Sequence, residues 1–160
     1  MKIAFYKVKE NDKSTFLDKA IAFFTSSWKE RLNGDFLKSY SHCEIILDNL
    51  MISSSPRDKG VRIKEFKDTG RWDFIEINDI NETKIKEFLY SQIGKKYDFL
   101  GILGFFTFTK DSEDKWFCSE IIIRALQIGG LVELGDMNAG SSSPNRLYKK
   151  LKDTNEIRNC

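Results

Sequence analysis

The sequence has few of the residues that supply most metal and nucleophilic chemistry. Its 160 residues include one histidine, three cysteines and two prolines. An odd number of cysteines at scattered spacings does not form a disulfide framework, so we expect free thiols in a reducing compartment. A structural zinc site needs four Cys or His ligands, and His42, Cys43, Cys118 and Cys160 are all that the chain has. We therefore predict that no metal and no other cofactor is bound.

Charge of one sign and long apolar runs are also missing. Lys and Arg number 26 against 24 Asp and Glu, mixed along the chain, so nucleic acid is not an expected partner. The longest apolar run, Phe99–Phe108, is about half of the roughly 20 residues that span a bilayer as a helix. The charged N-terminus lacks the apolar core of a signal peptide. We expect a cytoplasmic protein without a transmembrane segment.

The elements that are present predict an α+β fold. The 41% of hydrophobic residues suffice for one domain over residues 1–160. Alternating apolar runs predict strands, and apolar residues at helical spacing predict helices. The strands are expected at 2–8, 43–47, 50–55, 60–66 and 72–77, and the helices at 15–24, 81–94 and 118–129, followed by a loop and a short amphipathic tail. The strands follow one another by short turns, so we expect an antiparallel sheet packed against helices.

His42 lies in the stretch "SHCEIIL" and has three possible roles: metal ligand, partner of a nucleophile, or polar residue at a strand end. His42 and Glu44 form half of a zinc-deaminase signature. The paired cysteines of the other half are absent, and a strand replaces the helix which that site needs. Cys43 points to the opposite strand face from His42 and adds no ligand there. The metal role is therefore the weakest.

Cys118 is the best candidate for a nucleophile. It stands where the helix in "WFCSEIIIRAL" begins, and the N-terminus of a helix stabilises a thiolate. A neighbouring imidazole would complete the thiolate–imidazolium pair that activates cysteine hydrolases, and His42 alone can supply it. The competing interpretation is a small buried cysteine and an unrelated polar histidine. We expect Glu120 to serve the first helical turn and not the chemistry.

Four blocks of sequence together resemble a known family. "YSHCEIIL", "MISSSPRDKGVRIKEF", "GKKYDFLG" and "WFCSEIIIRAL" occur in the order typical of the circularly permuted NlpC-type papain-like cysteine hydrolases. This is the YiiX-like group, to which lecithin retinol acyltransferase is a distant relative, and small proteins of tailed phages also look like this. The resemblance covers residues 2–126. It implies a papain-like fold in which the histidine strand precedes the cysteine helix.

The resemblance also implies a role for each matching residue. Cys118 matches the nucleophile, His42 the general base and Tyr97 the tyrosine beside the oxyanion site. The third catalytic position, which orients the histidine, falls on the strand after the hairpin. A two-residue loop would pair Glu44 with Ser53 on the face of His42, so Ser53 is the best match and Glu44 an alternative.

These residues predict a thiol hydrolase or acyltransferase. It would act on a peptide, isopeptide, amide or ester bond through a Cys118 thioester, with a peptide, a protein conjugate or a lipid-like acyl group as substrate. If the protein is encoded by a phage, it would act in the cytoplasm of the host cell. The alternative is a binding module that has kept the fold and lost catalysis.

Overall fold

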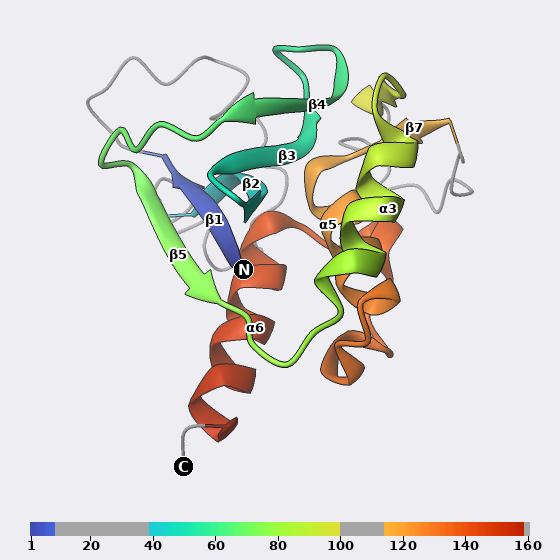
Figure 1. The fold of residues 1–160 in the computed structure, drawn as a ribbon. Coiled ribbons are helices and arrows are strands. Elements are labelled where there is room, and N and C mark those ends of the chain that lie inside the picture. Colours follow the sequence, from blue (N-terminus) through green and yellow to red (C-terminus); the bar gives the residue numbers. More distant parts are fainter. Residues whose placement is uncertain (9–38, 100–113, 159–160) are drawn as a thin grey trace.

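The strands form one mixed sheet in the computed structural model, which describes residues 1–8, 39–99 and 114–158 (Figure 1). The described strands lie in the order β5-β1-β2-β3-β4-β6-β7, and their pairs are antiparallel except β6 with β7. Their bounds are β1 Lys2–Lys7, β2 Tyr40–Leu47, β3 Leu50–Ser55, β4 Gly60–Glu65, β5 Trp72–Glu76, β6 Lys96–Tyr97 and β7 Lys115–Trp116. The predicted α+β class is confirmed.

Three α-helices lie in the described ranges: α3 Glu82–Gln92, α5 Cys118–Ile128 and α6 Pro144–Arg158. Short 3-10 turns, η2 Val132–Leu134 and η3 Ala139–Ser141, connect α5 to α6. Helix α5 packs against β2 and β3 and is flanked by α3 and α6 (Figure 1). None of these helices is long and apolar enough to cross a bilayer.

The turn between β2 and β3 sets the register of the site. Asp48 and Asn49 both have positive φ, 49° and 63°, which short polar side chains tolerate. The resulting two-residue hairpin pairs Leu47 with Leu50, as predicted. Pairing between the two strands extends only to Ile45, and β2 then continues beside β1 alone. The two strands therefore separate at the level of Glu44.

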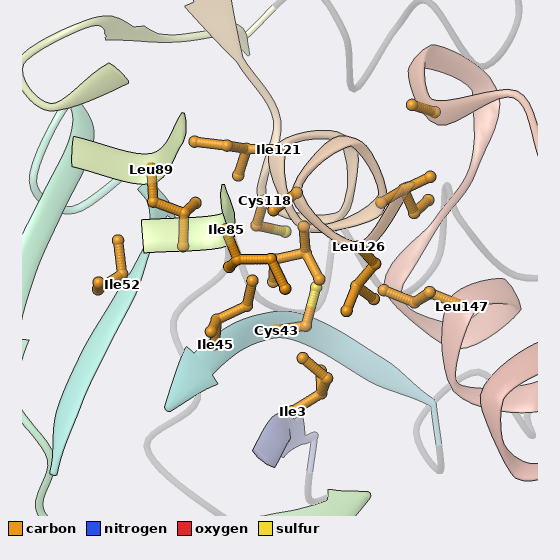
Figure 2. Packing of buried hydrophobic residues seen from close by; sticks show 14 of the residues in the cluster. Ile3, Cys43, Ile45, Ile52, Ile85, Leu89, Cys118, Ile121, Leu126 and Leu147 are labelled. Carbon is orange, nitrogen blue, oxygen red and sulfur yellow. The ribbon is translucent and has the colours of Figure 1, made fainter. Parts of the chain in front are cut away.

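The core lies between one face of the sheet and α5. Ile3, Ile45 and Ile52 on the strands and Ile122 on the helix have at most 1% of their surface exposed. Figure 2 shows these strand side chains and Cys43 directed toward the helix. Helix α5 is held tightly because most of its residues are buried, including both Cys118 and Leu126. The first turn of α5, which begins with Cys118, is thus fixed against the sheet.

Most predicted elements are present, including α3, which ends at Gln92, and Gly94 two residues later has the left-handed φ of 84°. The C-terminal segment differs from the prediction of a loop and a short tail, because α6 has 15 residues. The Ser143 hydroxyl accepts the Arg146 N–H at 3.2 Å and caps this helix, and Leu147 and Leu151 are buried. The helix predicted at 15–24 and most of the run at 99–108 lie outside the described residues.

Candidate active site

Cys118 is the first residue of α5 and has no exposed surface. Phe117 before it is extended, with φ −84° and ψ 155°, so the helix begins at the cysteine itself. The Glu120 carboxylate accepts the Phe117 N–H at 3.2 Å, which confirms its predicted place in the first turn. The N–H groups of a first helical turn have no helical carbonyl to bond, and the helix dipole adds to their effect. This position favours a thiolate.

Strand β2 brings the only histidine of the chain to the same place. His42 and Cys118 share a side-chain hydrogen bond. His42 Nε2 lies 2.6 Å from Glu44 Oε1. Because the carboxylate occupies Nε2, we assign the bond with the sulfur to Nδ1. A sulfur, an imidazole and a carboxylate thus follow one another in a hydrogen-bonded chain.

Strand β2 is irregular around His42, because its pairing with β3 ends at Ile45 and its register with β1 shifts beside His42. Between Tyr6 and Lys7 of β1 the register with β2 shifts, because Ser41 is the extra residue of a β-bulge. A bulge of this kind bends its strand and increases the local twist. His42 is only partly buried, with 16% of its side chain exposed. Its ring therefore connects the buried Cys118 to the molecular surface.

Glu44 is a buried carboxylate with a fixed counterion. It has 1% of its surface exposed and accepts two hydrogen bonds from Arg62 of β4, one of them from Nη1 at 2.7 Å. Arg62 also donates from Nε to Asp58 at 2.9 Å. Burial alone would raise the pKa of Glu44, but His42 and Arg62 lower it below its usual value. Glu44 is therefore ionised and oriented by Arg62.

The charged side chains around Cys118 and His42 make these two residues an ion pair. Burial alone would lower the pKa of His42, but Glu44 and Cys118 raise it to about 9. Burial alone would raise the pKa of Cys118, but hydrogen bonds from Cys43 and the charge of His42 lower it to about 5. The two groups titrate together, so these values describe the pair. At pH values between about 5 and about 9, Cys118 is therefore a thiolate and His42 an imidazolium.

Glu44, not Ser53, is the residue that contacts His42. The Ser53 side chain is fully buried on β3, and its hydroxyl donates to the Ser54 carbonyl at 3.5 Å. No hydrogen bond joins Ser53 to His42 within the part of the chain that is described. Ser53 instead pairs with Arg62 in the β3–β4 register. It leaves room for the Arg62 side chain to reach across β3 to Glu44.

Tyr97 lies near the cysteine through its ring. It is buried on β6, and its ring centroid is 5.8 Å from that of Phe117, the residue before Cys118. The ring of Phe99 packs on it at 4.9 Å. The structure thus joins three of the five predicted residues, His42, Cys118 and Glu44, and places Tyr97 against the residue before the cysteine. The predicted role of the tyrosine hydroxyl toward an oxyanion stays a prediction.

A pocket of about 160 Å³ opens beside His42. Its lining includes His42 and Glu44, the aromatic side chains of Tyr6 and Trp72, and the charged side chain of Arg57. Cys118 is not among the residues that line it and has no exposed surface. A substrate bound in this pocket would meet the imidazole first.

Arg62 was missed by the sequence analysis. Its place opposite Ser53 in the β3–β4 register depends on the turn at residues 56–59, whose length the sequence alone does not fix. The predicted pairing of Glu44 with Ser53 is not among the β2–β3 pairs, which extend only to Ile45 with Ile52. Within the described ranges, no group of three or more His, Cys, Asp and Glu side chains could hold a metal ion. Cys160 lies outside those ranges.

No protein family, curated protein or solved structure matches this chain in the comparisons made.

Proposed function

We propose that the protein is a cysteine hydrolase or acyltransferase that works through a thioester on Cys118. One observation carries the proposal: the chain from Cys118 through His42 to Glu44, with Arg62 behind the carboxylate. A nucleophile, a base and a group that orients the base are the parts that nucleophilic catalysis needs. The bond attacked is an amide, peptide, isopeptide or ester bond.

The reaction would proceed in two steps. The Cys118 thiolate attacks the substrate carbonyl, and the imidazolium of His42 gives its proton to the leaving amine or alcohol as the carbon–nitrogen or carbon–oxygen bond breaks. His42, now neutral, then removes a proton from water or from an acceptor alcohol or amine, which attacks the thioester; the carbon–sulfur bond breaks, and Cys118 leaves as the thiolate beside the imidazolium. Backbone N–H groups at the start of α5, and the Tyr97 hydroxyl, would stabilise the oxyanion.

Glu44 and Arg62 would give His42 its working charge. The carboxylate on Nε2 fixes the ring orientation and favours the imidazolium before attack. Arg62 keeps Glu44 ionised, so the proton stays on the ring that delivers it. A peptide, a protein conjugate or a lipid-like acyl group would be the substrate.

The fold that we propose is the circularly permuted NlpC-type papain-like fold, with the YiiX-like group as the family. Its support is the order of the parts: a histidine strand, a hairpin, and then a helix that begins with the cysteine. In a phage-encoded protein of this kind, the place of action would be the cytoplasm of the host cell.

A small activated ester tests the proposal without knowledge of the substrate. With p-nitrophenyl acetate, we expect mass spectrometry to find an acetyl group on Cys118 of the wild-type chain. The variants Cys118→Ala and His42→Ala should lose this modification, and Cys160→Ser, the matched control, should keep it. Acetylation elsewhere with Cys118 unmodified would contradict the proposal.

A second candidate function is a binding module without catalysis. It is favoured by the burial of Cys118, whose thiol has no exposed surface for a substrate to reach. The acetylation experiment separates the two, because a module with an inert thiol would give no acyl group on Cys118 even at high ester concentration.

A further inference from the structure

A second thiol faces the candidate nucleophile. Cys43 lies between His42 and Glu44 in the sequence, on the core face of β2, and has no exposed surface. Figure 2 shows its side chain pointing from β2 toward the first turn of α5, where Cys118 lies. The two thiols share a side-chain hydrogen bond, and the backbone N–H of Cys43 also bonds to the sulfur of Cys118. Both cysteines are free.

The two thiols differ in which of them keeps its proton. Burial raises the pKa of Cys43 well above the ordinary thiol value, and the charges of Cys118 and Glu44 raise it further. The pKa of Cys118 shifts in the opposite direction. Two neighbouring titratable groups whose environments separate their pKa values in this way have distinct roles. Cys43 therefore keeps its proton to a higher pH than Cys118 does.

We propose that Cys43 is a positioning residue of this site, whose S–H donates a hydrogen bond to the Cys118 thiolate and holds its sulfur beside His42. This inference rests on the proposed function. An S–H is a weak donor to a neutral acceptor, but a bond to an ionised acceptor is stronger. The thiolate would otherwise meet the hydrocarbon side chains of the core on this side. His42 and Cys43 are neighbours on β2, and their side chains leave a strand on opposite faces, so we expect them to contact different sides of the sulfur.

A purely structural role makes a different prediction. If Cys43 only fills space in the core, then removing its sulfur changes the stability of the fold and leaves the titration of Cys118 unchanged. If it donates to the thiolate, its loss raises the pKa of Cys118 by about one to two pH units. Serine would restore most of the effect, because its hydroxyl is also a donor of similar size.

The test is a pH titration of thiolate absorbance in the ultraviolet, which reports ionisation without requiring access to the sulfur. Full-length wild type, Cys43→Ala and Cys43→Ser would be compared, with Cys118→Ser to assign the signal. Ile52→Val is the matched control, because it also removes a small group from the same buried sheet face. We expect the transition near pH 5 in wild type and in Ile52→Val, a higher value in Cys43→Ala, and a value close to wild type in Cys43→Ser.

The outcomes separate this inference from the proposed function. If the pKa of Cys118 is low in wild type and equally low in Cys43→Ala, the role of Cys43 is overturned and the proposed function stands. A wild-type transition at the ordinary thiol pKa overturns both. If Cys43→Ala does not fold, Cys43→Val supplies the same loss of a donor with the volume retained, and it should show the same raised pKa.

Discussion

Replacing Glu44 by glutamine removes the charge that holds His42 as an imidazolium. The two side chains are in direct contact, with 2.6 Å between Nε2 and Oε1. For charge centres about 4 Å apart and an effective dielectric constant of about 20, the lost attraction is about 4 kcal/mol, equivalent to about three pH units. His42 in Glu44→Gln should therefore titrate near pH 6, compared with about 9 in wild type.

The assay is clean because the chain has a single histidine. One imidazole resonance, followed by NMR as a function of pH, reports His42 without an assignment problem. Glu76→Gln is the matched control, since Glu76 is an exposed carboxylate at 3.2 Å from Lys2. It should leave the titration of His42 where it is in wild type.

The glutamine can still accept a hydrogen bond from Arg62, and Asp58 remains as a second acceptor. We therefore expect the free energy of unfolding to fall by about 1–3 kcal/mol, which leaves the chain folded for the titration. Equal His42 titrations in wild type and Glu44→Gln would refute the reasoning, as would a wild-type value near 6.5.

Three further predictions concern stability and the role of Ser53. In Ser53→Ala the pKa of His42 followed by NMR should be unchanged, because Glu44 provides the contact with His42. A fall in this pKa as large as in Glu44→Gln would assign the orienting role to Ser53. Gly60→Ala should lower stability to urea by about 1–3 kcal/mol or more, because an added Cβ would lie 2.1 Å from the Lys95 carbonyl oxygen, and an unchanged midpoint would contradict that close approach. The raised pKa of His42 contributes stability that is fully present below pH 6.5 and is lost as the pH rises through about 9. The lowered pKa of Cys118 contributes stability that is fully present above pH 9.0 and is lost as the pH falls through about 5. The two effects cancel between pH 6.5 and 9.0, so the free energy of unfolding of wild type should not change with pH in this range. In Cys118→Ala it should fall as the pH rises. Equal pH dependence of the unfolding free energy in the two proteins would contradict the ion pair.

Local signals predicted much of the fold. Asp48 and Asn49 placed the hairpin because a two-residue loop needs residues that tolerate positive φ. A helix beginning near Cys118 was predicted from "CSEIIIRALQIGG", and α5 begins at that residue. Helix α6 was not expected at its full length, because its Lys-rich sequence shows only a narrow apolar stripe, and Leu147 and Leu151 are buried by tertiary packing.

The site was predictable as far as its residues lie on neighbouring elements. His42 and Glu44 share a strand, so their proximity follows from strand periodicity alone. The contact of Cys43 with Cys118 was not predicted, because alternation placed Cys43 on the face opposite His42. Both residues nevertheless interact with the sulfur of Cys118, on a strand whose pairing with β3 ends at Ile45. Such a separation of strands is a tertiary feature without a sequence signature.

Alkylation of the folded wild type by a small reagent such as iodoacetamide at about pH 6.5 tests most directly whether Cys118 is an activated nucleophile. This pH lies between the values of about 5 and about 9 for the two partners, so the thiolate and the imidazolium coexist. Peptide mass spectrometry should find Cys118 labelled ahead of Cys43 and Cys160, and His42→Ala should remove that advantage while the chain stays folded. Cys118 left unlabelled in the folded wild type, or labelled equally fast without His42, would contradict a catalytic cysteine and favour the binding module.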